Sequence, residues 1–265
     1  MSSITGGTAT QYTDSRKLAA RARLNQDYTI AETPWFEWVA QHLPLKPGHH
    51  VLDIGCGPAW FWAAAMASVP ANLALTLADA SPGMVDEALA RCSQLPFHSV
   101  TGRQADAADL PFADASFDAI IAMHILYHLP DPAAGIAEAF RVLKPGGTLA
   151  VTTNGAGNMR EIYELTTVFG SAPIDPAAAA FGFDKAEQLM QAQFGNVTMT
   201  LHPARLRITN PEDVFLALTS YPPGEGASPA QQAAFRQAID RAFQRGNGVL
   251  EVQKETGLFL STKTA

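Results

Sequence analysis

The segment Val51-Leu-Asp-Ile-Gly55-Cys-Gly57-Pro-Ala59-Trp60 joins an apolar strand to a helix through a Gly-x-Gly turn. Glycine permits the positive φ of such a turn and lets a ligand approach the backbone closely. The helix N-terminus that follows offers unpaired N–H groups and a partial positive charge, which suit an anionic group. Strand-to-helix turns also use glycine for structural reasons alone, so this segment by itself does not identify a ligand.

Three features around this turn discriminate among nucleotide ligands. A dinucleotide fingerprint requires a third glycine where Trp60 stands, and the chain has no G-x-x-x-x-G-K-[ST] loop for a triphosphate. Asp53, just before the turn, would repel a pyrophosphate but suits a cationic α-amino group. Asp79 follows 26 positions later at the end of the second strand, where a carboxylate can accept both hydroxyls of a ribose.

Short apolar runs alternate with helix-length segments over the middle of the chain. The strand candidates are 50–54, 73–78, 98–104, 117–122 and 147–153, and the helix candidates are 59–68, 81–94, 132–143 and 156–169. This alternation predicts an α/β fold with a doubly wound, mostly parallel sheet.

The flanks predict a cover over that sheet's ligand crevice. We expect an N-terminal helical cover at 1–47, a core at 48–154, and cap helices with closing strands of the same domain at 155–265. In the last segment, 197–202 and an edge strand at 257–261 are strand candidates, and the rest of 171–256 is predicted to be mostly helix and loop.

Composition favours a soluble cytoplasmic protein. The 265 residues carry 18 Lys plus Arg against 25 Asp plus Glu, a net charge of −7, and 47% of them are hydrophobic. The acidity disfavours nucleic-acid partners. Two cysteines cannot build a disulfide framework, and we expect neither a signal peptide nor a membrane span.

Several ordered blocks resemble a known family. VLDIGCGPA, LADASPGMVDEA, ADAADLPFADASFDAIIAMHILYHLPD and EAFRVLKPGGTLAVTTNG are similar to the motifs of class I S-adenosylmethionine (SAM)-dependent methyltransferases related to ubiquinone-biosynthesis enzymes. The resemblance covers residues 48–154 and departs at Ala59, where the family's first motif has glycine. It implies a Rossmann-like seven-stranded sheet with an antiparallel edge strand and a helical cap.

The resemblance also implies cofactor contacts. It places Asp53, Gly55 and Gly57 at the methionine part of SAM, Asp79 at the ribose, Gly83 and Met84 beside the adenine, Asp106 at the adenine amino group, the Ala107 N–H at a ring nitrogen, and Ala122 and Met123 near the sulfonium. Ala80 is a further candidate for cofactor binding. For Asp106 a capping role in ADAADLPF is an alternative, and for Met84 simple core packing is compatible with the cofactor role.

Methyl transfer from a sulfonium is an in-line displacement, and a base is needed only if the acceptor atom must lose a proton. His124 follows the fourth strand and is the candidate general base, because the reference pKa of histidine lies near neutrality. Tyr127 is a candidate for orienting the acceptor. His128 either lines the pocket or fixes the loop. No glutamate or further ligand cluster accompanies the two histidines, so we expect no metal.

The N-terminal cover and the aromatic run after the glycine turn are expected to set substrate choice. Arg21 is a candidate partner for the SAM carboxylate, with a solvated helix face as the alternative, and Tyr12 and Tyr28 are candidate pocket residues. Of Trp60, Phe61 and Trp62, one is expected to face the crevice and the others the core, because the three cannot share one helix face. We select Trp60 for the substrate pocket.

These features predict a methyltransferase that acts on an O, N or C atom of a small, aromatic or apolar metabolite, as a monomer or homodimer. A nucleic-acid methyltransferase is disfavoured because AMHI stands where an N/D-P-P-Y run is expected. A Rossmann oxidoreductase is disfavoured by Trp60 and by the lack of a Tyr-x-x-x-Lys pair. A non-catalytic SAM-binding or ligand-sensing protein remains open.

Overall fold

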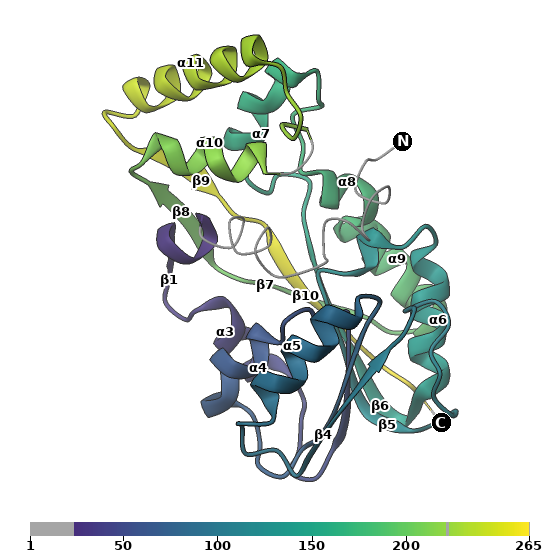
Figure 1. The fold of residues 1–265 in the computed structure, drawn as a ribbon. Helices are drawn as coiled ribbons and strands as arrows, with labels where there is room; N and C mark the ends of the chain where they lie inside the picture. The colour runs from purple at the N-terminus through teal and green to yellow at the C-terminus, as the bar shows by residue number, and fades with distance from the viewer. Residues whose placement is uncertain (1–23, 221–222, 265) are drawn as a thin grey trace.

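A seven-stranded sheet with the order β4-β3-β2-β5-β6-β10-β7 forms the centre of the computed structural model, which describes residues 24–220 and 223–264 (Figure 1). Its strands are β2 (His50–Ile54), β3 (Ala74–Asp79), β4 (Ser99–Gln104), β5 (Phe117–Met123), β6 (Leu143–Asn154), β7 (Thr198–Leu201) and β10 (Thr256–Thr262). The first five in chain order are parallel, and β10 is antiparallel to both β6 and β7. The mostly parallel, doubly wound sheet is confirmed.

The edge of the sheet differs from the prediction. The run 257–261 was expected to close the sheet, but β10 lies one position inside the edge and β7 is the edge strand. The physical reason is burial: Leu258 and Phe259 of β10 are both buried, whereas all four residues of β7 are exposed. An apolar strand gains more from the inner position than a polar one does.

Helices cover both faces of the sheet (Figure 1). The helices α3 (Trp35–His42), α4 (Trp60–Ala65) and α5 (Pro82–Cys92) pack on one face, and α6 (Pro132–Val142), α8 (Pro176–Phe181) and α9 (Phe183–Phe194) pack on the other. Several begin at a side-chain cap followed by proline: Ser81 caps α5, Asp131 caps α6 and Asp175 caps α8.

The cap is a second unit with its own hydrophobic core. It contains an antiparallel sheet of β1 (Thr29–Ala31), β8 (Ala204–Ile208) and β9 (Leu250–Gln253), with α7 (Arg160–Leu165), α10 (Pro211–Thr219) and α11 (Pro229–Arg245) packed on it. Most of 171–256 is helix and loop, as expected, but the sequence did not predict the three-stranded sheet of the cap. These strands are short and pair with segments that are distant in the sequence, for example Thr29 with Leu206. A local pattern of apolar and polar residues therefore does not predict them.

The core and the cap are joined where β9 runs into β10 through Lys254 and Glu255. There Asp175 accepts hydrogen bonds from the side-chain amides of Asn154 and Asn158, each at 2.8 Å. The Glu255 carboxylate accepts from the Gly157 N–H at 2.9 Å. This buried polar joint fixes the β9–β10 turn at the carboxyl edge of the parallel strands.

Within the described ranges, no helix is long and apolar enough to cross a membrane, and no group of three or more His, Cys, Asp and Glu side chains is arranged to hold a metal ion.

Candidate active site

The glycine turn is held at the carboxyl end of β2 by hydrogen bonds to β3. The N–H groups of Gly55 and Cys56 donate to the Ala78 carbonyl at 2.7 and 3.0 Å, and the Gly57 N–H donates to Oδ2 of Asp79 at 3.0 Å. Gly57 has φ +50° and faces open space where a side chain would begin, whereas a Cβ on Gly55 would collide with Ile125. The backbone at Gly57 therefore has open space beside it, and its contact with a ligand stays a prediction.

Ala59, which stands where the similar motif has glycine, adopts a backbone conformation that favours glycine. Ala59 is buried and adopts the left-handed conformation at φ +57°, as the residue before α4. Glycine takes this conformation freely, and an L-residue pays about 1 kcal/mol for it. The alanine therefore carries strain at the start of α4.

Asp53 lies buried behind the glycine turn. Its Oδ2 accepts a hydrogen bond of 2.8 Å from the Trp62 indole, and burial raises the pKa of the carboxyl to about 7, with the nearby Asp79 adding to the rise. A cationic group beside the two carboxylates would relieve both the desolvation and the repulsion.

Asp79 ties the glycine turn to the start of α5. Besides the Gly57 contact, its Oδ1 accepts from the Ser81 N–H at 2.9 Å. Burial raises the pKa of this carboxyl, while the backbone donors oppose the rise. The neighbouring Ala80 carbonyl accepts from the side-chain amide of Gln104 at 3.0 Å.

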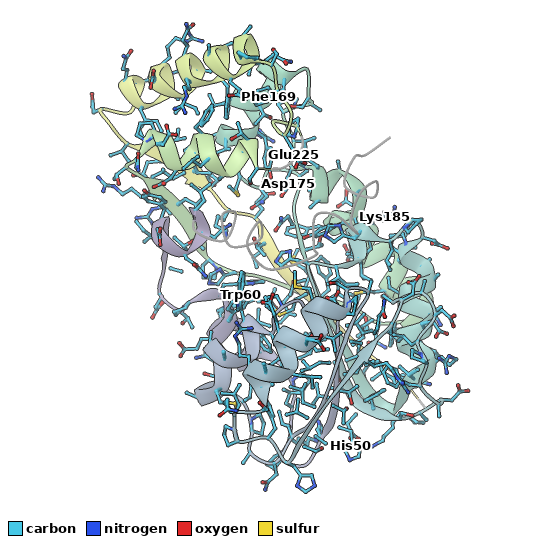
Figure 2. The ribbon with its side chains drawn as sticks, viewed as in Figure 1. His50, Trp60, Phe169, Asp175, Lys185 and Glu225 are labelled. Atoms are coloured by element: carbon cyan, nitrogen blue, oxygen red, sulfur yellow. The ribbon has the colours of Figure 1, made fainter. Side chains whose placement is uncertain are left out.

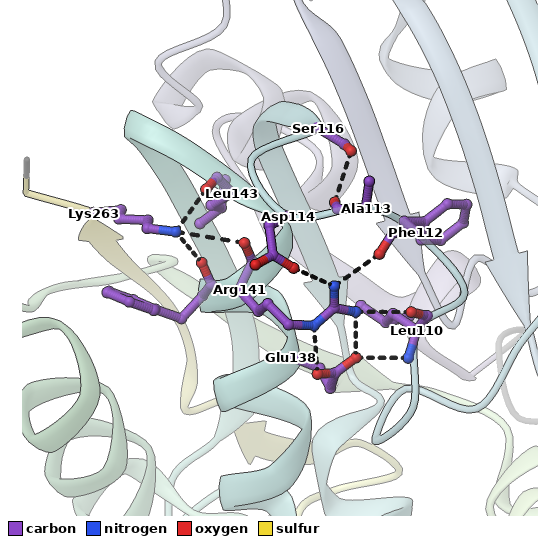
Figure 3. Close-up of polar contacts among 10 residues, drawn as sticks. Leu110, Phe112, Ala113, Asp114, Ser116, Glu138, Arg141, Leu143 and Lys263 are labelled. Atoms are coloured by element: carbon purple, nitrogen blue, oxygen red, sulfur yellow. Dashed lines mark hydrogen bonds and ion pairs between the residues drawn. The ribbon is translucent and has the colours of Figure 1, made fainter.

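The loop with Asp106 and Ala107 is anchored from α6 (Figure 3). Arg141 donates to the carbonyls of Leu110 and Phe112, and Glu138 pairs with Arg141 while accepting from the Leu110 N–H at 2.8 Å. Asp106 is exposed and accepts from the Ala108 N–H at 2.9 Å, so it closes a local turn in place of the helix cap considered from the sequence. Its contact with adenine stays a prediction.

The remaining cofactor candidates lie along buried elements. Met84 and Ala122 are 1% and 2% exposed, Ala107 is buried, and Met123 is partly buried at the end of β5. Met84 thus has the core packing that was compatible with its cofactor role.

His124 follows β5 in a left-handed conformation, with φ +55°. Its ring is partly buried and lies 5.8 Å from Trp35 and 6.3 Å from Tyr127, centroid to centroid. Burial, with smaller contributions from the positive charges of Lys254 and His128, lowers the pKa of His124 to about 4. We selected His124 as the candidate base because histidine ordinarily has a near-neutral pKa. In the folded protein the pKa of His124 lies well below that value. The His128 ring contacts the Tyr127 ring at a tilt of 58°, with ring centroids 4.5 Å apart.

The aromatic run at the start of α4 divides as expected: Phe61 and Trp62 are in the core, and Trp60 is partly exposed. Figure 2 places Trp60 at the end of the core that faces the cap, and His50 at the opposite end. The Tyr28 hydroxyl donates to Asp213 of the cap, which raises the pKa of Tyr28 to about 12, so this phenol is engaged within the cap. Tyr12 and Arg21 lie outside the described residues.

Sequence reasoning missed a group of side chains opposite His124. Trp35 and Trp38 of α3 stack on each other at 5.7 Å, and each lies 5.2 Å from His202 in the turn between β7 and β8. Lys254 of the β9–β10 turn is electrostatically coupled to both histidines. We call Trp35, Trp38, His124, His202 and Lys254 the aromatic–cation cluster. No sequence motif signalled it, because its residues come from α3 and from three separate turns.

Comparisons with known proteins agree with this geometry. Residues 52–151 match the model of a family described as "Methyltransferase domain". The chain is 38% identical over 125 residues to 27-O-demethylrifamycin SV methyltransferase of Amycolatopsis mediterranei, over 46% of this chain and 44% of that one. It is 37% identical over 114 residues to demethylmenaquinone methyltransferase of Desulfitobacterium hafniense, over 43% and 45%. The chain spans less than half the length of these curated relatives.

Solved structures share the fold. The YcgJ protein of Bacillus subtilis superposes with a TM-score of 0.59 at 18% identity, over 87% of this chain and 98% of that one. Phosphoethanolamine N-methyltransferase 2 of Haemonchus contortus, in complex with SAM, superposes with a TM-score of 0.59 at 19% identity, over 99% of this chain and 60% of that one. Residues 52–151 thus form a methyltransferase domain, and the chain has the fold and motifs of the class I methyltransferases that use SAM.

Proposed function

We propose that this protein transfers the methyl group of SAM to an O, N or C atom of a small, planar metabolite. The observation that carries the proposal is the Asp79 carboxylate, which bridges the N–H groups of Gly57 and Ser81 beside an open, left-handed glycine backbone. Relatives named for demethylrifamycin SV and demethylmenaquinone support a small-molecule acceptor.

The residues of the site fit the cofactor. Asp53 and Asp79 offer two carboxylates to a cationic, hydroxyl-bearing ligand, and Gly57 leaves room for it against the backbone. When bound, SAM supplies a methyl carbon on a positively charged sulfur. Trp35, beside His124, provides a wall for a planar acceptor and excludes water from the end of β5.

The pKa of His124 limits which acceptors the protein can deprotonate. At pH 7 the His124 imidazole is neutral and can accept a hydrogen bond, because its pKa is lowered to about 4. A full proton transfer to it from a phenol of pKa about 10 would be uphill by roughly 8 kcal/mol. An acceptor that reacts as an anion, or whose reacting atom carries no proton, fits this site best. In the proposed step the acceptor atom forms a bond to the methyl carbon while the carbon–sulfur bond breaks and its electron pair stays on sulfur.

Calorimetry of the full chain with SAM and S-adenosylhomocysteine tests the cofactor site. Asp79→Asn should weaken both affinities by about tenfold or more, since it removes the charge and one acceptor oxygen. Asp86→Asn, an exposed aspartate on α5, is the matched control and should leave them unchanged. No binding by the wild-type chain would overturn the proposal.

A screen of small phenols, acids, amines and thiols for release of S-adenosylhomocysteine then tests turnover. Release with one class of acceptor is the expected result. Tight cofactor binding without release from any class would favour the non-catalytic SAM-binding alternative.

A further inference from the structure

Four separate chain segments converge opposite the end of β5 to form the aromatic–cation cluster. Trp35 lies 5.8 Å from His124 and 5.2 Å from His202, so it stands between the two histidines. The Nε2 of His202 is 2.9 Å from the Thr33 carbonyl, which can only accept, so this nitrogen carries the proton and the ring is held in place. These mutually tilted rings line one side of the end of β5 with aromatic surface.

Lys254 brings a positive charge near these rings, because it lies two residues before Thr256, whose carbonyl accepts a hydrogen bond from the His202 N–H at 3.0 Å. Its ammonium donates to the side-chain oxygen of Asn25 at 2.6 Å, and among the described residues no carboxylate is within ion-pair distance of it. The attractive charge that acts on it is that of Asp175, at the cap of α8. Burial lowers its pKa to about 8, so at pH 7 most molecules still carry a desolvated cation there.

A buried hydroxyl lies in the same region. Thr152 is 2% exposed, and its Oγ1 has no hydrogen-bond partner among the described residues. It follows Ala150 by two positions on β6, so it faces the same side of the sheet as the core cluster that contains Trp38, Ala150 and Leu258. Its backbone carbonyl accepts from the His124 N–H at 3.1 Å. A buried polar atom without a partner, on the residue that holds the His124 backbone, points to a polar ligand.

We propose that the aromatic–cation cluster is the acceptor subsite and that the acceptor is a planar molecule with an anionic oxygen, a carboxylate or a phenolate, bound to Lys254 and lying against the rings of Trp35 and His124. This inference rests on the proposed function, because an acceptor subsite requires a methyl donor beside it. It makes Lys254 and Trp35 specificity-determining residues, and it agrees with a neutral, weakly basic His124.

The sheet order separates this cation from the methionine part of SAM. Lys254 precedes β10, which lies three strand positions from β2 and its glycine turn. At about 4.8 Å per strand this is roughly 14 Å. Lys254 is therefore assigned to the acceptor and not to the carboxylate of the methyl donor.

The test uses the full chain saturated with S-adenosylhomocysteine and shape-matched pairs of probes, of which one member is anionic and the other neutral. The carboxylate arm pairs 4-hydroxybenzoate with 4-hydroxybenzamide and 2-naphthoate with 2-naphthamide, and the phenolate arm pairs 2,4-dinitrophenolate with 2,4-dinitroanisole. Thermal shift identifies the probes that bind, and calorimetry measures their affinities. The anionic member of at least one arm should bind about tenfold or more tightly than its neutral partner. The arm that shows the preference identifies the anion.

Substitutions assign the preference to Lys254. Lys254→Met should abolish it and Lys254→Arg should retain it, while Lys185→Met, an exposed lysine of α9, should leave it unchanged. The affinity for S-adenosylhomocysteine should be the same in all four proteins. Equal binding of both members of every pair, no binding by any anionic probe, a preference that survives Lys254→Met, or loss of S-adenosylhomocysteine affinity in that variant would overturn the inference. Failure of the wild-type chain to bind S-adenosylhomocysteine would instead overturn the proposed function.

Discussion

The Asp53 carboxyl makes stability depend on pH in an unusual direction. Its folded pKa of about 7 lies above the unfolded value of about 3.9, so between these values the folded state holds more protons than the unfolded state. The free energy of unfolding should therefore fall as the pH rises from about 4 to about 7, by on the order of 3–4 kcal/mol from this group at most. Asp53→Asn keeps an acceptor for Trp62 and removes the charge.

Urea unfolding at pH 8 and at pH 4 measures the effect. Asp53→Asn should be more stable than the wild-type chain at pH 8 and equal to it at pH 4. Asp118→Asn is a control of opposite sign, because backbone and Lys144 hydrogen bonds lower the pKa of Asp118 and its charged form stabilises the fold. Equal stability of Asp53→Asn and the wild type at pH 8 would show that the carboxyl is not desolvated as described.

The left-handed backbone at His124 predicts an order among substitutions. Asparagine tolerates a positive φ better than alanine, which pays about 1 kcal/mol for this conformation. His124→Asn and His124→Ala both remove the imidazole and its contact with Trp35, so their difference reports the backbone alone. The midpoint of thermal unfolding should be higher for His124→Asn. A higher midpoint for His124→Ala would show that the conformation is not a constraint.

At the scale of single residues, sequence motifs located the glycine turn, Asp79 and His124 but could not supply their environments. The pKa of His124 depends on burial and on Lys254, which is 130 positions away in the chain. Lys254 itself belongs to no motif, and its position follows only from the joining of β9 and β10.

At the scale of elements, two helices begin with the same tripeptide in different surroundings. Asp131-Pro-Ala133 starts α6 at the surface, and Asp175-Pro-Ala177 starts α8 in the interior; each aspartate accepts from the N–H two residues on, at 3.0 and 2.9 Å. Asp175 also accepts from Asn154 and Asn158, which tie the core sheet to the cap. Comparing Asp131 with Asp175 therefore separates the stability contributed by a helix N-cap from that contributed by the interior hydrogen bonds.

Alanine substitutions at the two positions measure the joint. Asp131→Ala should cost about 1 kcal/mol, the usual value of an N-cap. Asp175→Ala should cost about 3 kcal/mol or more, because it also leaves two buried amide donors without their acceptor. The free energies of urea unfolding give both values. Equal costs would mean that the joint contributes nothing beyond the cap.

The elements of the core could be predicted because short, local stretches of sequence specify apolar strands and helix caps. The strand candidates 50–54, 73–78, 98–104 and 117–122 agree with β2, β3, β4 and β5 to within one residue at each end. The candidate 147–153 is part of the longer β6, because Lys144 to Gly147 continue the strand. The cap strands β1, β8 and β9 have three to five residues each, and their pairing depends on tertiary contacts that no short window contains.

At the scale of the whole molecule, the acceptor subsite draws residues from the sheet core and from the turns that lead to the cap, so an anionic ligand should stabilise both units together. Lys254 sets the pH dependence of this effect. Three titratable groups interact with the Lys254 ammonium. The Asp175 carboxylate at the N-cap of α8 favours its charged form. The other two groups are His124 and His202, whose pKa values are lowered. The pKa of Lys254 is about 8 without ligand, and a bound anion raises it.

The two consequences for stability have opposite signs. Without ligand, the lowered pKa means that Lys254 destabilises the fold below about pH 8 and that this cost is lost between about 8 and 10.5. A bound aromatic acid stabilises the fold through its ion pair with the Lys254 ammonium. This stabilisation is present below about pH 8 and is lost above it, as Lys254 loses its proton. The rise in melting temperature caused by the preferred acid should therefore shrink between pH 7 and pH 9.5, at constant S-adenosylhomocysteine. In Lys254→Arg it should stay constant, because arginine keeps its charge over this range. The same decline in both proteins would show that another group binds the anion.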